Sequence, residues 1–373
     1  MQPPPADPVD ILRILLAGGP AAPRRALLER SGAGLAPTGP MLAARLRAVP
    51  TRDIDRCLAW LARPRHHLLS WGQPGYPPLL RQQAHAPPGL FVAGDPGLLW
   101  RPGLAVVGSR AASAAGRDNA RHFARSFCRT GLVVVSGLAA GIDAAAHEAA
   151  LDCAGATVAV LGTGPDRAYP ASNATLLERV AASGAVVSEH APGTPPRTEH
   201  FPSRNRIIAG LALGTVVIEA ALRSGALITA RLAAEAGREV FALPGSIHHA
   251  QARGCHHLIR DGAALVETPD EVLAGIAPLA GRLARELAPS AMETAPEQGP
   301  AEVGGRPLNC DNAPHTLWKA LGHDPIPMDV LVDRTGLTAA DLSAMLLGME
   351  LDGRVTVEHG RYARRSTGGG PYA

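Results

Sequence analysis

Short apolar runs alternate with alanine-rich stretches between residues 101 and 275, and this alternation restricts the possible folds more than any other feature of the chain. The apolar runs are predicted to be strands, at 104–107, 132–135, 157–161, 185–188, 215–218, 239–243 and 264–266. The stretches between them include predicted helices, at 116–129, 140–154, 173–182, 204–213 and 226–236. Parallel strands need long crossover connections, and strands covered on both faces are apolar along their whole length. The pattern therefore predicts an α/β fold built on an extended, Rossmann-like parallel sheet.

Composition divides the chain into four segments. Residues 1–70 have helical apolar spacing broken by Gly and Pro, which is typical of a small helical domain. The predicted core, 71–275, opens with a proline-punctuated, extended lead-in to the sheet. Residues 276–312 are rich in Ala, Pro, Gly and Glu, and we expect a flexible linker there. In 313–373, three predicted helices, at 316–321, 328–335 and 339–352, precede a predicted hairpin at 355–363. This order of elements is typical of a winged-helix domain.

Overall composition limits the expected location of the protein and the kinds of site it contains. The chain has 373 residues, 46% hydrophobic and 18% charged, which suits soluble domains. It has no run of about 18 uncharged apolar residues, and its N-terminal segment carries charges where a signal peptide would be apolar. We therefore expect a cytoplasmic protein that does not contact a membrane. The five cysteines lack CxxC spacing, so no disulfide framework and no metal site is predicted, and a net charge of +3 does not by itself indicate nucleic acid.

Glycine-rich turns follow the first two predicted strands of the core. The first turn contains Gly108, Ser109 and Arg110, and the second runs from Ser136 and Gly137 to Gly141. Doubly wound sheets bind ligands beyond the carboxyl ends of such strands. Exposed amides and hydroxyls there can donate to a phosphate, and an arginine can add a charge-assisted pair of hydrogen bonds. The GxGxxG dinucleotide fingerprint is absent, so no nucleotide cofactor is predicted.

The segment Phe201-Pro202-Ser203-Arg204-Asn205-Arg206 is the strongest single indication of an anion site. It places two arginines, Arg204 and Arg206, at a predicted helix start, where the helix dipole disfavours positive charge unless an anion offsets it. A solvated or salt-bridged turn is the alternative interpretation. After the strand at 215–218, Ser224 and Gly225 form another turn that can donate amides.

Familiar catalytic motifs are missing from the sequence. GxxxxGK[ST], HExxH and a GxSxG elbow do not occur. Asp143 and Glu219 are conceivable acid–base groups, but we favour a first-turn helix acid for Asp143 and a loop-ordering acceptor for Glu219. Single histidines near loops, such as His147 and His190, are more often structural than catalytic. The sequence therefore favours a binding protein over an enzyme.

Taken together, the motifs resemble those of the bacterial DNA-processing protein A family (DprA, also called Smf), over nearly the whole chain. The matching segments are Val107-Gly108-Ser109-Arg110, 136–143, Tyr169-Pro170, 201–210, 224–227 and Leu243-Pro244-Gly245. The resemblance implies a core that binds single-stranded DNA, forms homodimers and loads RecA recombinase, protecting and processing incoming DNA in natural transformation. It implies no catalysis and no cofactor.

The resemblance also implies positions for two functional surfaces. The DNA pocket carries over to Gly108, Ser109 and Arg110, and the phosphate argument adds Ser136, Gly137, Gly141, Arg204, Asn205, Arg206, Ser224 and Gly225. The self-association surface carries over to His256, Ile259 and Leu265, with RecA contacts overlapping it. Several relatives have a basic residue where this chain has Ala171. The helical N-terminal region resembles the sterile-alpha-motif-like module of some members.

Two other classes of function stay open. Residues 214–219 are similar to the closing half of the PGGxGTxxE motif of nucleoside-monophosphate phosphoribohydrolases, but Leu211-Ala212-Leu213 replaces the preceding Pro-Gly-Gly. A nucleotide-hydrolysing enzyme on the same fold is therefore the alternative. A pure interaction protein without DNA is the third class. Because only 3% of the residues are aromatic, we expect phosphate contacts to dominate any single-strand binding.

Overall fold

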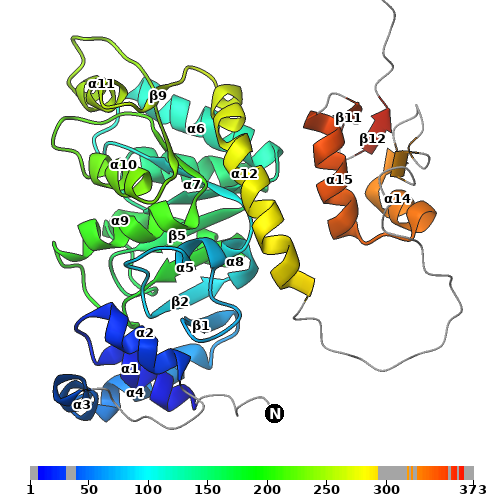
Figure 1. Ribbon diagram of the computed structural model, residues 1–373. Helices are drawn as coiled ribbons and strands as arrows, with labels where there is room; N and C mark the ends of the chain where they lie inside the picture. Colours follow the sequence, from blue (N-terminus) through cyan, green and yellow to red (C-terminus); the bar gives the residue numbers. More distant parts are fainter. Residues whose placement is uncertain are drawn as a thin grey trace, which may run out of the picture. The chain divides into compact units, whose positions relative to one another are not determined.

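The computed structural model describes residues 7–30, 39–292, 317–318, 321, 326–351, 354–358 and 361–364. The chain forms two compact units, which divide after Thr294. The first unit contains the predicted helical region and the sheet, and the second contains the predicted winged helix (Figure 1).

A nine-stranded sheet, in the order β1-β2-β6-β5-β4-β3-β7-β8-β9, is the framework of the first unit. The strands from β6 to β9 in this order are all parallel. These seven strands are the seven predicted from sequence, which confirms the α/β parallel sheet. Their bounds are β3 (Gly103–Val107), β4 (Val133–Ser136), β5 (Thr157–Leu161), β6 (Ala185–Ser188), β7 (Gly214–Val217), β8 (Glu239–Ala242) and β9 (Ala264–Leu265).

Two antiparallel strands extend the sheet beyond β6. They are β1 (His66–Ser70) and β2 (Gly89–Gly94), and β2 pairs with both β1 and β6. The second strand ends the extended lead-in predicted for this region, whereas β1 lies before residue 71, where the core was expected to begin. The sheet therefore starts at His66.

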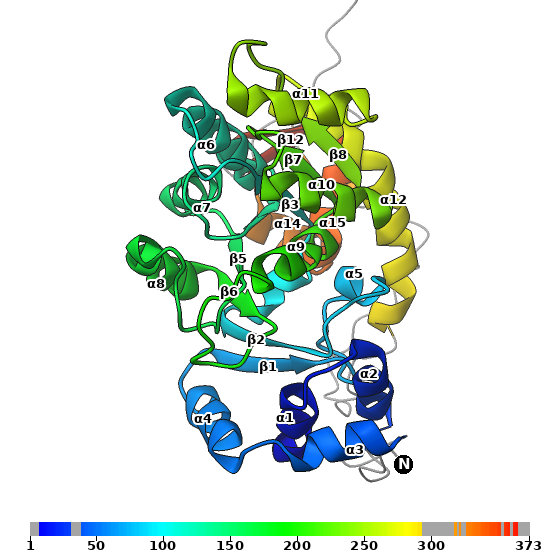
Figure 2. The same cartoon turned by 90° about the vertical axis from the view of Figure 1, so that its left-hand side faces the viewer.

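Helices cover both faces of the sheet (Figure 2). Leu104 and Val106 of β3 pack with α6, α7 and α12 on one face, whereas Ala105 and Val107 pack on the other face with α9 and α10. This alternation has the two-residue period of a strand. The helices of the core are α5 (Pro78–Arg81), α6 (Ala114–Arg129), α7 (Ile142–Asp152), α8 (Ala174–Ser183), α9 (His200–Leu211), α10 (Gly225–Glu235), α11 (Arg253–Arg260) and α12 (Pro269–Met292), with short 3₁₀ turns at Pro96–Leu99, Ala171–Asn173 and Ala250–Ala252.

The predicted N-terminal helical region packs against the β1–β2 end of the sheet. Trp60 meets Phe91 of β2 edge to face, with 5.9 Å between ring centroids. Arg25 donates to the backbone oxygen of Ala84 at 2.8 Å, and its guanidinium lies over the Trp71 ring. The N-terminal helices and the core thus share apolar and polar contacts. The helices are α1 (Pro8–Leu16), α2 (Ala21–Glu29), α3 (Pro40–Arg47) and α4 (Thr51–Leu61).

Helix α12 corrects the expected linker, which was placed at 276–312. The helix continues to Met292, and Val272, Ile276 and Leu279 are buried against the sheet. Ala, Leu, Arg and Glu in this segment are good helix formers, so their enrichment indicated a helix here and not flexibility. Within the part of the chain that the structure describes, no helix, α12 included, combines the length and apolar character needed to cross a membrane.

The second unit confirms the winged-helix prediction. Helices α14 (Met328–Thr335) and α15 (Ala339–Leu351) are followed by the hairpin β11 (Val355–Glu358) and β12 (Arg361–Arg364), and β10 (Ile326–Pro327) pairs with β12. Leu331, Leu342 and Leu346 form its buried centre. Of the first predicted helix, 316–321, only 317, 318 and 321 lie within the described residues.

Candidate functional site

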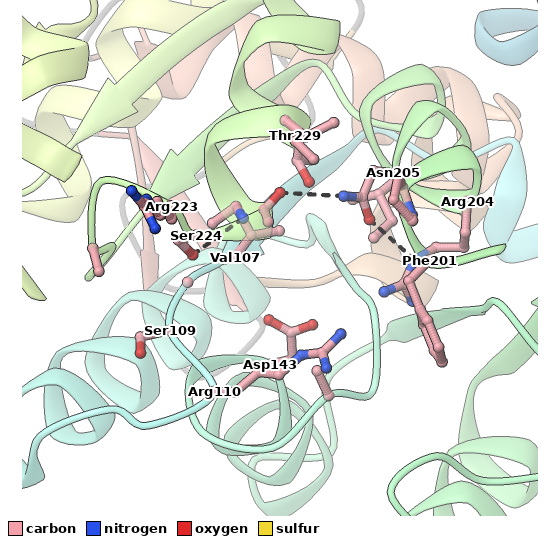
Figure 3. A pocket seen from close by; sticks show the side chains of 18 of the residues that line it. Val107, Ser109, Arg110, Asp143, Phe201, Arg204, Asn205, Arg223, Ser224 and Thr229 are labelled. Carbon is pink, nitrogen blue, oxygen red and sulfur yellow. Dashed lines mark hydrogen bonds between the residues drawn. The ribbon is translucent and has the colours of Figure 1, made fainter. Parts of the chain in front are cut away.

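A cavity of about 580 Å³ opens where strand order reverses, outside the carboxyl ends of β3 and β7. Open α/β sheets bind their ligands at this kind of switch point. The walls are formed by the turn after β3, the turn after β7 and the first turns of α9 and α10 (Figure 3). Seven of the predicted site residues line this cavity: Gly108, Ser109, Arg110, Arg204, Asn205, Ser224 and Gly225.

A second hollow of about 620 Å³ adjoins the first one. The two share Arg110, Ala139, Phe201 and Arg204 in their linings. The second hollow lies outside β4 and β5, and residues 167–171 form its far wall. Together the hollows make one continuous crevice along the carboxyl edge of the sheet, and Ala171 is in its lining.

Two glycines allow the turns after β3, β4 and β7 to pack against one another. A side chain at Gly108 would come within 2.8 Å of the backbone oxygen of Glu219, and one at Gly141 would collide with the backbone oxygen of Ser109. Gly141 also has a φ of +81°, a conformation that glycine adopts without strain. These glycines therefore shape the crevice, and neither is replaceable by a larger residue without moving a turn.

Several groups predicted to donate to phosphate already have partners inside the protein. The Ser109 amide donates to the Glu219 oxygen at 2.7 Å, and the Gly137 amide donates to Asp143 at 3.2 Å. Ser136 is fully buried, and its hydroxyl donates to the Val106 oxygen. The structure thus leaves Ser136 and Gly141 outside both hollows, and it brings Gly137 into the lining of the second hollow only.

Arg204 is not at a helix start, because α9 begins four residues earlier, at His200. The side chain is buried, and its Nη1 donates to the backbone oxygens of Gly137 and Val160. Its Nε donates to Asn205 Oδ1 at 3.3 Å. Burial lowers the pKa of the Arg204 guanidinium to about 10, although the nearby Asp143 carboxylate opposes this shift. Arg204 therefore ties together the ends of β4 and β5 from beneath the crevice.

The structure does not bring Arg206 into the crevice. Its guanidinium pairs with Glu189 at 2.5 Å, and it lines a separate cavity beside α2. Residues two apart on a helix point in directions about 200° apart, so Arg204 and Arg206 cannot face one ligand. Neither arginine lies at the helix start where the sequence predicted it, and the salt-bridged alternative describes Arg206.

Three other arginines supply the exposed charge of the crevice. Arg110 lies between the two hollows, Arg223 lines the first and Arg167 lines the second. All three are exposed, and among the described residues none of them has a hydrogen-bond or ion-pair partner for its side chain. Arg167 and Arg223 were not among the predicted site residues, although Arg167 closely precedes Tyr169-Pro170 and Arg223 directly precedes Ser224.

An aromatic pair stands beside these charges. The rings of Tyr169 and Phe201 lie 4.9 Å apart, and the Arg110 guanidinium lies 5.4 Å from the centre of the Phe201 ring. Tyr169 is 42% exposed, which leaves ring surface open to a ligand. A planar group could stack there while its charges meet the arginines. This aromatic pair was not predicted, because only 3% of the residues are aromatic.

The first turn of α10 faces the first hollow. Ser224 is its N-cap and accepts from the Ala226 amide at 3.3 Å, while Gly225 is exposed. Asn205 donates to the Gly225 oxygen at 3.2 Å and so connects α9 to this turn (Figure 3). The positive end of the α10 dipole adds to the potential of the nearby arginines.

The lining is poorly equipped for acid–base chemistry. Among the described residues that line the two hollows, Asp143 is the one carboxylate, and none is a histidine or cysteine. Burial raises the pKa of Asp143, while the Arg204 charge and the Ala139 and Gly137 amides oppose that shift. The arrangement can hold an anion with planar groups, but it presents no nucleophile paired with a base.

Glu219, the acid on which a hydrolase would depend, lies in a different hollow, with His248 and His249. Its carboxylate accepts from the Ser113 amide at 2.9 Å and from the Ser113 hydroxyl, at the start of α6. This is the loop-ordering role that the sequence favoured for Glu219. Metal clusters of three or more His, Cys, Asp or Glu side chains do not occur among the described residues.

Two histidines of the core are structural. His147 is fully buried, with its Nδ1 2.7 Å from the Thr157 hydroxyl. His190 stacks on His200 at 3.9 Å between ring centroids. Burial lowers the pKa of His147 to about 3 and that of His190 to about 4, so both stay neutral in the folded protein at neutral pH.

These low pKa values predict an acid-sensitive fold. Between about pH 6.5 and pH 4, His147 and His190 are protonated in the unfolded chain but stay neutral in the folded chain. The free energy of unfolding should therefore decrease as the pH is lowered across this window, by up to about 1.4 kcal/mol per pH unit for each histidine. Urea denaturation at several pH values measures the slope. His147→Gln should make the slope shallower, and an unchanged slope would contradict the assignment.

The predicted self-association residues lie at the far edge of the sheet. Leu265 is on the edge strand β9 and is 51% exposed. Ile259 of α11 is partly buried against the core, and His256 contacts the Gly245 oxygen through its Nε2 at 3.0 Å. Leu265 is thus the one of the three that presents a large apolar surface.

Two family profiles match the sequence. The one described as DNA recombination-mediator protein A matches residues 67–277, and the one described as DprA winged helix domain matches residues 288–361. Protein Smf of Escherichia coli (strain K12) is 39% identical over 326 residues, which are 86% of this chain and 83% of that protein. DNA processing protein DprA of Streptococcus pneumoniae is 50% identical over 199 residues, which are 53% of this chain and 70% of that protein.

Solved structures show the same likeness. The crystal structure of DprA from S. pneumoniae matches with a TM-score of 0.62 and 37% identity, covering 72% of this chain and 97% of that chain. DNA processing protein A from Helicobacter pylori matches with a TM-score of 0.52 and 26% identity, covering 58% of this chain and 97% of that chain. The latter structure is described as giving insight into a single-stranded DNA binding mode.

Proposed function

The chain belongs to the DNA recombination-mediator protein A family, and from this premise we propose that it binds single-stranded DNA in the crevice outside β3, β4, β5 and β7. The observation that carries the proposal is the set of three exposed arginines, Arg110, Arg167 and Arg223, whose side chains have no hydrogen-bond or ion-pair partner among the described residues. They surround two joined hollows that contain no acid–base pair in their described lining. The H. pylori relative, whose structure concerns single-stranded DNA, has the same core fold.

The crevice has a place for both components of a nucleotide chain. Phosphates would meet Arg110, Arg223 and the Gly225 end of α10, and a base would stack on Tyr169 and Phe201. Stacking is tolerant of sequence because every base has a flat face. We therefore propose binding without strong sequence preference, with stacking added to the phosphate contacts that the sequence predicted.

The remaining predicted residues divide by role. Gly108, Ser109, Asn205, Ser224 and Gly225 line the first hollow and are proposed DNA contacts or immediate supports. Ser136, Gly137, Gly141 and Arg204 are proposed to hold the turns, and Arg206 is not part of this proposal.

Salt dependence tests the proposed function. Three arginine contacts to phosphates of a single strand predict a slope of about −2 for log affinity against log salt concentration. Fluorescence anisotropy of a labelled oligothymidine of about 8 nucleotides, over a series of salt concentrations, measures this slope. A slope near zero, or no binding at low salt, would refute the proposal.

Family membership also supports the wider role. We propose that the protein acts in the cytoplasm as a homodimer and loads RecA onto the bound strand in natural transformation. The edge strand β9, with exposed Leu265, and the adjoining α11 are the proposed contact region, because an exposed sheet edge is open to another chain. Hydrolysis of nucleotides is not proposed, since Glu219 is engaged at the start of α6.

A further inference from the structure

Helix α6 carries four arginines at intervals of four residues. They are Arg117, Arg121, Arg125 and Arg129. The opposite side of the helix is buried through Ala120, Phe123, Ala124 and Phe127. Four residues of an α-helix rise about 6 Å, so the arginines form a row along the helix, here called the α6 row.

The α6 row begins at the crevice. Arg117 donates to the backbone oxygen of Ala112 at 2.7 Å, in the same turn that carries Arg110 and Ala111 into the first hollow. The first arginine of the row therefore contacts the loop that forms the cavity wall. The row therefore starts next to the turn that carries Arg110, at the end of the helix where Asp118 and the Glu219 carboxylate also lie.

The far half of the α6 row has no counter-charge. Arg121 is paired with Asp118 at 3.0 Å and lies 3.9 Å from Glu148. Arg125 and Arg129, in contrast, are exposed, and neither has a hydrogen-bond or ion-pair partner within the described residues. Arg129 is in the last turn, where the helix dipole favours a cation, but Arg125 is in mid-helix and has no such explanation.

We propose that the α6 row is an extension of the DNA site, along which the phosphates of a single strand leaving the crevice are held. This inference rests on the proposed function. Arg125 lies about 12 Å and Arg129 about 18 Å along the helix beyond Arg117. A strand must extend out of the crevice along α6 to reach them, so we expect them to act on strands longer than the crevice itself holds. Because the contacts are to phosphates, they add affinity and salt dependence without sequence preference.

Oligothymidines of two lengths, about 4 and about 30 nucleotides, test the inference by fluorescence anisotropy over a salt series. In the variant Arg125→Gln/Arg129→Gln, the slope of log affinity against log salt for the longer strand should become shallower by about 1.4, because each neutralised phosphate of a single strand contributes about 0.7 to the slope. The slope for the shorter strand should not change. The matched control is Arg47→Gln/Arg52→Gln, which removes two exposed arginines of α3 and α4, at the opposite end of the unit from α6 (Figures 1 and 2).

Each outcome decides the question. A shallower slope for the longer strand alone, with the control unchanged, supports the extension. An unchanged slope for the longer strand, or an equal change at both lengths, overturns it. Failure of the wild type to bind either strand would instead refute the proposed function itself.

Discussion

Replacing Arg110 with alanine should weaken binding of a short single strand by about 10- to 100-fold and leave the fold unchanged. Arg110 is the exposed guanidinium shared by both hollows, and it lies against the Phe201 ring. A hydrogen bond to a charged partner contributes about 1.5 to 3 kcal/mol, which corresponds to this range of affinity. Because its side chain has no hydrogen-bond or ion-pair partner among the described residues, its removal leaves no buried group unsatisfied.

Two controls make the Arg110 result specific. Arg110→Lys keeps the charge but loses the planar fork, so it should recover only part of the affinity. Arg47→Ala removes an exposed arginine of α3 and should not change binding. Thermal unfolding of all variants checks the fold, and the same anisotropy assay measures affinity. Wild-type affinity in a folded Arg110→Ala protein would mean that the strand does not cross the crevice.

The strands of the core could be predicted because their signal is local. Each is a buried run of Val, Leu, Ile and Ala ended by a turn, as in Val106-Val107-Gly108, and helices between them are the usual way to connect parallel strands. β1 was missed because its sequence, with His66 and His67, lacks that apolar continuity. α12 was not predicted, because the Ala, Pro, Gly and Glu content of its segment is also typical of linkers.

The candidate site was predictable in position but less so in detail. The turns after β3 and β7 were found because glycines at strand ends signal close packing, and the structure places both at the switch point. Whether an amide such as that of Ser109 is free or already bonded depends on partners more than 100 residues away, here Glu219. The exposed arginines Arg167 and Arg223 had no pattern of their own, because only the fold reveals that their side chains lack partners.

Arg204→Met should destabilise the protein by about 3 to 5 kcal/mol, the cost of leaving buried polar and charged groups without their partner. The substitution removes the donor to the Gly137 and Val160 oxygens and the positive charge near buried Asp143. Urea denaturation of the full chain measures this loss. Arg206→Met is the matched control on the same helix, and it should cost less, because its partner Glu189 keeps some contact with water.

Adding Asp143→Asn to Arg204→Met separates the charge from the hydrogen bonds. If the Arg204 guanidinium stabilises the fold partly by compensating the Asp143 charge, the double variant should be more stable than the sum of the two single losses predicts, by about 1 kcal/mol or more. Strict additivity would limit the role of Arg204 to its bonds with the two backbone oxygens. DNA binding of Arg204→Met should fail only where the fold fails, since the guanidinium holds the ends of β4 and β5. A variant as stable as the wild type that no longer binds DNA would show instead that Arg204 contacts the strand directly.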